Sequence, residues 1–336
     1  MPISNLRVRN TMILAGDIGA TSARLGAFTL ENVRLNLVLD EEYPTREHND
    51  TVEIIRSFIT KHRIAVERAC MAIAGPVRHG RVEATNLPWI VDAKQIAREL
   101  NLERVGLIND LEANAYGIFA LEGREIAVLN EGASDSCGNM AVISAGTGLG
   151  EAGLYWDEKQ HHPFACEGGH CDFAPGNDLE IELLRYLQDR FGHVSWERVV
   201  SGPGLNSIYE FLRETGRGDE PPWLAEEMRH KDPSSVISRV ALNQGNALCM
   251  RALELFISLY GAEAGNLALK IMATGGIFLG GGIAPKIMQE LKGSVFMRSF
   301  TAKGRFKHLL EAIPVRVILN DKAALLGAAR YAALKL

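Results

Sequence analysis

Two segments rich in glycine and threonine could bind phosphate groups. They read "GDIGATS" and "SAGTGLG", and their candidate anion-binding residues are Gly16, Asp17, Gly19 and Thr21 in the first and Gly146, Thr147 and Gly148 in the second. Backbone N–H groups in such turns form a concave nest for an anion, and side-chain hydroxyls add donors. One such turn in each half of the chain predicts that a polyphosphate is clamped between them. Two ordinary tight hairpins are the alternative, because Gly, Asp and Ser are common in turns.

The residues beside these turns favour a nucleotide with its metal ion. Asp17 is the candidate anchor, through water, for Mg²⁺, an ion that keeps most of its waters and takes few carboxylates. A third glycine cluster, "LGGGIAPK", contains Gly281 and Gly282 and would let an adenine and a ribose approach the backbone closely. Alone, this cluster would be only a strand-to-helix turn.

The second segment also contains the dinucleotide-binding fingerprint G-x-G-x-x-G, at Gly148, Gly150 and Gly153. That fingerprint needs a strand before it and a helix that opens at its third glycine. "AVIS" predicts the strand, but "LYWDEKQHHP" after Gly153 predicts a second strand and a turn. The sequence therefore argues against an NAD-dependent oxidoreductase.

Asp110 is the candidate catalytic base. It lies in "GLINDLEANA", where an expected strand meets an expected helix, which is the usual place for ligands in an α/β sheet. A carboxylate there could accept the proton of a substrate hydroxyl during phosphoryl transfer. The alternative is an N-cap, a common role of Asp before an apolar-periodic helix.

A second group of polar residues could bind the hydroxyls of a sugar. "CEGGHCDF" places Glu167 and His170 around two glycines, and "HVSWERVVSG" adds Glu197. Such side chains on glycine-bent loops suit hydrogen bonds to neighbouring hydroxyls, and Asn86 and Asn109 are amides of the right type. His170 could instead be a buried histidine with its hydrogen bonds satisfied, and the two asparagines could be turn residues.

An α/β scaffold is needed to position these residues. "MILAGDIGATSARLGAFTL" and "AVISAGTGLGEAGLYW" each predict a strand, a turn and a returning strand, which indicates an internal duplication. Between them, "ACMAIAG", "DAKQIARELN", "RVGLIN" and "DLEANAYGIFALE" predict a strand, a helix, a strand and a helix. This alternation is typical of βαβ connections.

The second half of the chain is expected to be more helical. "VISRVALNQGNALCMRALELFISLYGAEAGNLALK" predicts one long helical region, and "GGIFLGGGIAPKIMQEL" predicts a strand, a glycine turn and a helix. "VRVILND" and "KAALLGAARYAALK" predict a final strand and helix. The polar, proline-broken "RETGRGDEPPWLAEEMRHKDPSS" predicts an exposed insertion.

Composition limits the class of protein. With 336 residues the chain exceeds the size at which one hydrophobic core stops growing, so two lobes are expected. Its 47% hydrophobic and 23% charged residues are typical of a soluble globular protein. A net charge of −5 without a long basic run argues against nucleic-acid binding. We expect neither a signal peptide nor a membrane span.

The cysteines favour a reducing compartment. There are five, an odd number scattered along the chain, so they form no disulfide framework. Cys166, His170 and Cys171 lack a further cysteine pair that would complete four zinc ligands, and no structural zinc is expected. A cytoplasmic location follows.

Together these segments resemble the bacterial-type glucokinases, which have the fold of hexokinase, acetate kinase and actin. The resemblance covers nearly the whole chain, and its motifs include "LAGDIGATSARL", "INDLEANAYGI", "SAGTGLG", "EGGHCDFAP", "HVSWERVVSGPGL" and "GGIFLGGGIAPK". It implies that Asp110 is the catalytic base and that Asn109, Glu167, His170 and Glu197 bind a hexose. It also implies that the two glycine turns bind the phosphates of ATP with Mg²⁺, and that the product is glucose 6-phosphate.

The resemblance also implies a fold. We expect a two-lobed α/β, actin-like ATPase (ribonuclease H-like) fold with duplicated β-sheet cores and an interdomain cleft that holds the sugar. The expected domains are a small α/β domain, residues 1–119 plus 320–336, and a large α/β domain, residues 120–319, with dimerisation and nucleotide-binding elements. Sugar binding should draw the lobes together about hinges near residues 117–120 and 319–322. A homodimer that acts on glucose and ATP is expected.

The chain departs from the family pattern at two places. The first turn usually reads G-G-T-N, whereas here it reads "GATS" from Gly19; Thr21 remains, and activity is expected. The cysteine-rich zinc motif of the related kinase and repressor group is missing. One alternative is a non-catalytic sugar-binding regulator of the same fold, which would need a DNA-binding module that we do not expect upstream of Gly16. A kinase with another hexose as its main substrate is a further alternative.

Overall fold

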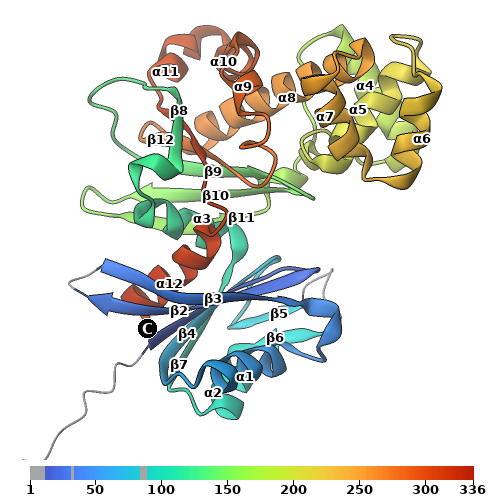
Figure 1. The fold of residues 1–336 in the computed structure, drawn as a ribbon. Helices are drawn as coiled ribbons and strands as arrows, with labels where there is room; N and C mark the ends of the chain where they lie inside the picture. Colours follow the sequence, from blue (N-terminus) through green and yellow to red (C-terminus); the bar gives the residue numbers. More distant parts are fainter. Residues whose placement is uncertain (1–11, 32–33, 84–88) are drawn as a thin grey trace, which may run out of the picture. The chain divides into compact units, whose positions relative to one another are not determined.

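The computed structural model describes residues 12–31, 34–83 and 89–336. The chain divides into two compact units, a smaller one of Met1–Glu122 with Lys322–Leu336 and a larger one of Gly123–Asp321. The C-terminal helix α12 (Ala323–Lys335), drawn in red, therefore belongs with the blue N-terminal strands (Figure 1).

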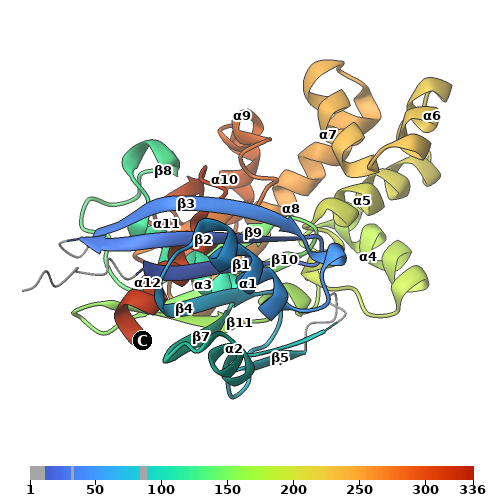
Figure 2. The same cartoon turned by 60° about the horizontal axis from the view of Figure 1, so that its bottom comes forward.

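A five-stranded mixed sheet forms the centre of the smaller unit. Its strand order is β3-β2-β1-β4-β7, seen side by side in Figure 2, with antiparallel pairs β3–β2 and β2–β1 and parallel pairs β1–β4 and β4–β7. A short hairpin, β5–β6, lies outside it. The elements before α12 are β1 (Met12–Ile18), β2 (Ser22–Glu31), β3 (Arg34–Pro44), α1 (Thr51–His62), β4 (Val66–Ile73), β5 (Arg81–Glu83), β6 (Ile90–Asp92), α2 (Ala93–Leu100), β7 (Arg104–Asn109) and α3 (Asp110–Gly117).

Helices cover both faces of this sheet. Successive side chains of a strand point to opposite faces, so the apolar strands supply two cores. Leu14 shares one core with Phe58 of α1, and Ile13 and Cys70 share the other with Leu325 of α12. Burial on both faces explains why β1 and β4 are almost continuously apolar.

Two glycines let α3 and α12 pack backbone to backbone. A Cβ added at Gly117 in α3 would overlap the carbonyl oxygen of Ala323, and a Cβ added at Gly327 in α12 would overlap that of Ala113. The rings of Tyr116 and Tyr331 meet edge to face beside this contact, with centroids 5.4 Å apart. The last helix is thus tied to the helix that begins at Asp110.

The sheet of the larger unit repeats the plan of the first. Its order is β11-β10-β9-β12-β13-β8, with antiparallel pairs β11–β10 and β10–β9 followed by parallel pairs β9–β12 and β12–β13. The first five of these strands match β3-β2-β1-β4-β7 in direction, and β8 adds an antiparallel edge. The predicted duplication of the sheet core is confirmed. The strands are β8 (Ile126–Asn130), β9 (Met140–Ala145), β10 (Leu149–Trp156), β11 (His161–Cys166), β12 (Gly276–Gly280) and β13 (Val315–Ile318).

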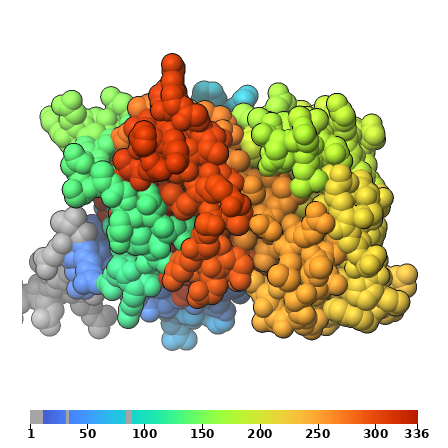
Figure 3. Space-filling view, turned by 90° about the horizontal axis from the view of Figure 1, so that it is seen from above, coloured from blue at the N-terminus to red at the C-terminus, as the bar shows by residue number. Residues whose placement is uncertain are grey.

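The helices of the larger unit pack beside α8 and over its sheet. They are α4 (Asp178–Phe191), α5 (Gly202–Glu214), α6 (Pro222–His230), α7 (Pro233–Asn243), α8 (Ala247–Ile271), α9 (Met288–Leu291), α10 (Ser294–Thr301) and α11 (Lys307–Glu311). In Figure 3 the first four, coloured from yellow-green to orange, form one side of the face shown. In the three described ranges we find no helix long and apolar enough to cross a membrane.

The long helical region predicted over residues 236–270 consists of two helices, α7 and α8. The chain breaks between α7 and α8, because Gly245 adopts a left-handed φ of 68°. Asn246 then caps α8 by accepting a hydrogen bond from the backbone N–H of Cys249 at 3.0 Å. An Asn at the N-cap is a common start signal, so the sequence contained the information.

The segment predicted as an exposed insertion, residues 213–235, is mostly exposed, but it contains a helix that the sequence analysis did not predict. Its centre is helix α6, and Leu224 in that helix is fully buried. Pro222 and Pro233 occupy the first positions of α6 and α7. A proline there loses no helical hydrogen bond, so these prolines begin helices instead of interrupting them.

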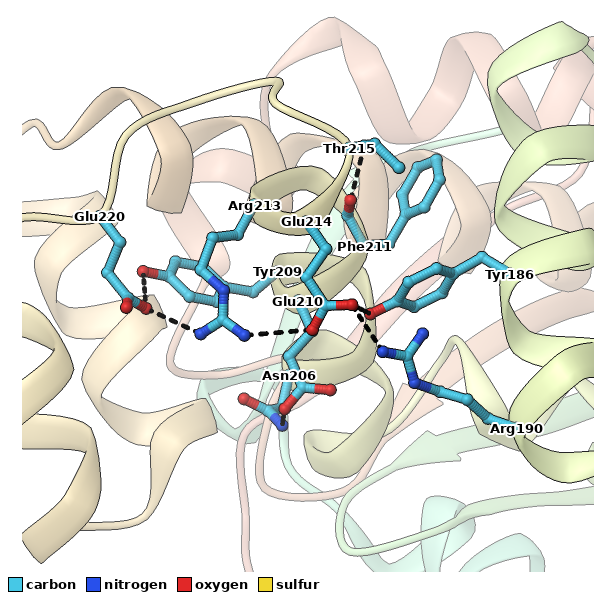
Figure 4. Close-up of polar contacts among 10 residues, drawn as sticks. All are labelled: Tyr186, Arg190, Asn206, Tyr209, Glu210, Phe211, Arg213, Glu214, Thr215 and Glu220. Atoms are coloured by element: carbon cyan, nitrogen blue, oxygen red, sulfur yellow. Dashed lines mark hydrogen bonds and ion pairs between the residues drawn. The ribbon is translucent and has the colours of Figure 1, made fainter.

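A network of ion pairs joins α4 to α5 (Figure 4). Glu214, at the end of α5, accepts hydrogen bonds from the Tyr186 hydroxyl at 3.0 Å and from Arg190 at 2.7 Å. Arg213 bridges Glu214 and Glu220 at 3.2 Å each. Linked charges of this kind stabilise more than isolated surface pairs.

Replacing Gly327 with Ala should destabilise the smaller unit by about 1–3 kcal/mol, because the new methyl group must push α12 away from α3. The thermal midpoint of Gly327→Ala measures the loss. Gly123→Ala is the matched control, since a Cβ at Gly123 meets no described atom within 4 Å. Equal midpoints for the two variants would contradict the close helix contact.

Candidate active site

Asp110 opens α3 directly after β7 ends at Asn109. The side-chain Oδ1 of Asn109 caps the helix and accepts the N–H groups of Leu111 at 2.9 Å and Glu112 at 3.2 Å. The N-cap alternative for Asp110 is therefore wrong, because its neighbour fills that role. The Asp110 carboxylate accepts the Leu111 N–H at 3.0 Å from the first helical position. A helix N-terminus favours a negative charge there.

The two asparagines proposed as sugar ligands differ in what can be said of them. Asn109 is buried, and its Nδ2 donates to the carbonyl oxygen of Gly75 at 3.2 Å. Together with the helix cap, this bond orients its amide. Asn86 lies outside the described residues.

Asp17 lies in β1 near Asp110, within the smaller unit. Burial, and then the negative charge of Asp110, raise the pKa of Asp17 to about 6, and Arg24 opposes the shift. The sheet thus brings together two carboxyl groups that are far apart in the sequence. Two nearby carboxylates of which one is partly protonated are a common feature of sites that handle protons or cations.

The first glycine turn, between β1 and β2, has an exposed tip at Ala20 and Thr21. The N–H of Gly19 donates to the Ser22 carbonyl at 2.9 Å, and the hydroxyl of Thr45 donates to the Gly19 carbonyl at 3.0 Å. These two hydrogen bonds hold the base of the turn, and its tip is exposed, as an anion-binding turn requires.

Packing within the smaller unit explains the glycine at position 16 without a bound ligand. It lies inside β1, and a Cβ there would overlap the sulfur of Met71 and crowd Leu25. Its role in cofactor binding stays a prediction.

In the larger unit, the second glycine turn is held from two sides. The N–H of Gly202, at the start of α5, donates to the carbonyl of Gly146 at 2.8 Å. The N–H of Ile283, after β12, donates to the carbonyl of Ala145 at 3.3 Å. The segment around Gly281 and Gly282 therefore lies against the second turn, and the structure brings these two predicted cofactor-binding segments together.

The glycines of these segments fall into two kinds. A Cβ at Gly148 would overlap the Glu197 carboxylate, and a Cβ at Gly281, where φ is 79°, would overlap the Ala145 carbonyl. At Gly146 and Gly282, in contrast, a Cβ would meet no atom of the described chain within 4 Å. Packing demands a glycine at position 281, and a side chain at position 148 would displace the Glu197 carboxylate, whereas Gly146 and Gly282 face open space that a ligand could fill.

Glu167 and His170 stand at the two ends of one tight loop, residues 167–170, which ends in the 3-10 helix η4 (Gly168–His170). The N–H of His170 donates to the Glu167 carbonyl at 3.0 Å. Both side chains are exposed, so the alternative of a buried histidine is wrong. A Cβ at Gly169 would overlap the Leu149 carbonyl, which shows that the loop rests on the first residue of β10.

The Glu197 side chain also contacts Leu149, the first residue of β10. Its Oε2 accepts the backbone N–H of Leu149 at 3.0 Å. Glu197 belongs to the 3-10 helix η5 (Trp196–Arg198), whose Trp196 N–H donates to the Cys171 carbonyl at 3.0 Å. The structure thus gathers the 167–170 loop, Glu197 and the second glycine turn around Leu149.

Sequence reasoning missed Glu151. This residue lies on β10 among apolar neighbours, and it is 1% exposed with a buried, unpartnered Oε1. The available signal was a charged residue at an inward position of an apolar strand. Across the described ranges no three His, Cys, Asp or Glu side chains group so that they could hold a metal ion.

Comparison with known proteins gives consistent matches. A family model described as Glucokinase matches residues 14–335. A protein named glucokinase from Nostoc sp. (strain PCC 7120) is 42% identical over 339 residues, covering 96% of this chain and 99% of that protein. One from Photorhabdus laumondii is 36% identical, covering 95% of this chain and 96% of that protein.

Solved structures match as well. The crystal structure of a glucokinase from an Antarctic psychrotroph has a TM-score of 0.83 at 31% identity, covering 96% of this chain and 98% of that one. A Balamuthia mandrillaris glucokinase in complex with glucose has a TM-score of 0.78 at 22% identity, covering 96% and 94%. A ROK family glucokinase from Streptomyces griseus in complex with glucose and AMPPNP has 0.64 at 21%, covering 96% and 99%. The last two show the fold alone.

Replacing Asp17 with Asn should stabilise the protein at neutral pH. Because the pKa of Asp17 is raised from 3.8 to about 6, the stability that its proton confers is fully present below the ordinary value and is lost as the pH rises through about 6. The variant should gain roughly 1–3 kcal/mol above that pH, and the gain should shrink as the pH falls towards 4. Thermal denaturation from pH 5 to 8 measures it. A gain independent of pH would contradict the raised pKa of Asp17.

Proposed function

Because the chain belongs to the glucokinase family, we propose that it transfers the γ-phosphoryl group of ATP to the 6-hydroxyl of glucose. Relatives of the same length carry the name glucokinase, and two structures of the same fold were solved with glucose, one of them also with AMPPNP. The observation that carries the proposal is the Glu197 carboxylate, which bonds the backbone at Leu149 beside the second glycine turn. Candidate sugar ligands and a candidate phosphate loop thus share one rigid support.

Glu167, His170 and Glu197 are the proposed ligands of the sugar hydroxyls, with Asn109 and Asn86 from the smaller unit. Carboxylates accept hydrogen bonds from hydroxyls, and amides and imidazoles both donate and accept. A loop that presents exposed polar side chains on a backbone packed against a strand holds them in fixed positions. Such a site discriminates strongly against analogues that lack a hydroxyl.

Asp110 is the proposed general base. Its carboxylate accepts the proton of the 6-hydroxyl while that oxygen forms a bond to the γ-phosphorus and the bond to the ADP oxygen breaks. The Asn109 cap and the bond from the Leu111 N–H keep Asp110 in position at the helix N-terminus. Most of the remaining catalysis is positioning and electrostatic stabilisation of the phosphoryl group.

The two glycine turns and the segment around Gly282 are the proposed ATP site. Asp17 suits a water-bound Mg²⁺, because carboxylate oxygens are the ligands that this ion prefers. The charge of Asp110 raises the pKa of Asp17, and a nearby cation would offset this repulsion between the two carboxylates. When bound, this ion supplies charge neutralisation on the phosphates. Open space at Gly146 and Gly282 is where we place backbone contacts to the nucleotide.

Homodimer formation remains a prediction from the resemblance, and a cytoplasmic location remains a prediction from the cysteine pattern and the N-terminal sequence.

Replacing Asp110 with Asn should lower kcat by roughly 10² to 10⁴, the usual cost of losing a general base. The thermal midpoint should stay within a few degrees, because Asn109 caps α3 and an Asn at position 110 can still accept the Leu111 N–H. Steady-state kinetics with saturating glucose and ATP gives kcat. Near-normal turnover would remove Asp110 from the chemistry.

Equilibrium binding should separate the sugar site from the nucleotide site. Glu167→Ala should weaken glucose binding at least tenfold and leave ATP binding unchanged, because hydroxyl partners are lost. Gly146→Ala should do the reverse, since its methyl group fills space assigned to the nucleotide without touching the described fold. Isothermal titration with each ligand measures both effects, and Glu158→Gln, at an exposed turn residue, is the control. If both variants lose the same ligand, the assignment is wrong.

A further inference from the structure

Glu151 is a buried carboxyl that the proposed reaction does not use. Glu151 is only 1% exposed, and its Oε1 has no hydrogen-bond partner. An unpartnered charged oxygen in an apolar interior costs several kcal/mol, so the group lowers this cost by taking up a proton.

Glu263 of α8 is the carboxyl whose charge acts on Glu151. It is fully buried, and it accepts hydrogen bonds from Lys270 Nζ at 2.9 Å and from Asn266 Nδ2 at 2.8 Å. Lys303 Nζ holds the same Asn266 through its Oδ1 at 2.6 Å. Both oxygens of Glu263 are thus engaged by donors, whereas Oε1 of Glu151 has none.

One proton is therefore held on Glu151. Burial, and then the charge of Glu263, raise the pKa of Glu151 to about 8, and Lys270 opposes the shift. Protonated Glu151 can donate to Glu263, which gives its otherwise unpartnered oxygen a partner. Tyr260 on α8 and Cys166 on β11 also interact with Glu151. The further ionisable groups around the Glu151–Glu263 pair are Glu167 and Cys171 beside Cys166, Lys303 beside Glu263, and Glu180 beside Lys303.

The carboxyl of Glu151 also forms the floor of the 167–170 loop. A Cβ at Gly168 would overlap Glu151 Oε2, so the loop backbone lies directly on this group. The Cys166 thiol, one residue before the loop, donates to the Glu151 carbonyl at 3.4 Å. No side chain at position 168 separates the carboxyl from the loop that carries Glu167 and His170.

We propose that protonated Glu151 is a positioning residue for the hexose site: it seats the 167–170 loop against Glu263, and loss of its proton unseats the loop and weakens sugar binding. The inference rests on the proposed sugar role of that loop. Two adjacent carboxylates repel each other strongly in a buried setting, and the ionised Glu151 can relieve this only by moving towards Gly168 or by admitting water. Sugar affinity therefore falls in alkaline solution.

The pH dependence of KM tests this directly. If only the protonated form binds sugar, the KM for glucose rises about tenfold between pH 7 and pH 9, while the KM for ATP changes little. Glu151→Gln has a permanent donor in place of the proton, so its KM for glucose should stay constant over this range. Glu158→Gln, on the same hairpin but exposed, should show the wild-type rise. An equal rise in Glu151→Gln and wild type overturns the proposal.

Amide resonances of the loop provide a readout that needs no sugar. The N–H signals of Gly168 and Gly169 should titrate near pH 8 in wild type and not in Glu151→Gln. If that variant fails to fold, Glu263→Gln serves instead, and the midpoint should move to lower pH because the repelling charge is gone. Static amide signals in wild type, with glucose binding still lost in Glu167→Ala, overturn this inference alone. Titrating amides with a constant KM for glucose overturn it together with the sugar role of the loop.

Discussion

Parallel strand pairing is the constraint on which the rest of the structure depends. In a parallel pair both strands end at the same edge of the sheet, so whatever follows them lies close together. Pairing of β1 with β4 and of β4 with β7 places Asp17 near Asp110 in the smaller unit. Pairing of β9 with β12 places the second glycine turn against the segment that follows Gly280 in the larger unit. The antiparallel pairs of β10 with β9 and β11 add the support of the 167–170 loop, which follows β11 and rests on Leu149 at the start of β10.

The elements that the sequence predicts well are those with local signals. Both strand-turn-strand units have a short apolar run on each side of glycines, and the structure has β1–β2 and β9–β10 there. Strand β10 continues past Gly153, where a dinucleotide-binding site needs a helix to begin. This agrees with the sequence argument against an NAD-dependent oxidoreductase. Helix α6 within residues 213–235 and the break at Gly245 were missed because proline and glycine were interpreted by type alone. A proline in the first turn of a helix marks where that helix begins, and a glycine between two helices marks where the first one ends. The same residue types are common in loops, so only their position in the element tells the two cases apart.

The candidate site was predictable as a set of residues but not as an arrangement. Glu167 and His170 share a short motif, whereas their support by Leu149 joins residues about twenty positions apart across a sheet. Glu151 and Glu263 are farther apart still, and neither has a motif, so their interaction follows only from how α8 packs on the sheet. The departure at the first turn is also explained: Ala20 lies at an exposed tip without a left-handed φ, where a methyl group is tolerated.

Helix α12 has a consequence for the order in which the chain can become structured during synthesis. The larger unit, Gly123–Asp321, is continuous in sequence and can bury its core once that stretch has emerged. The smaller unit is split, and one face of its first sheet lacks its covering helix until residues 323–335 have been made. The strands of the smaller unit are made before the larger unit but are fully enclosed only after it. Until then their apolar face, with Ile13 and Cys70, is exposed and can be bound by chaperones.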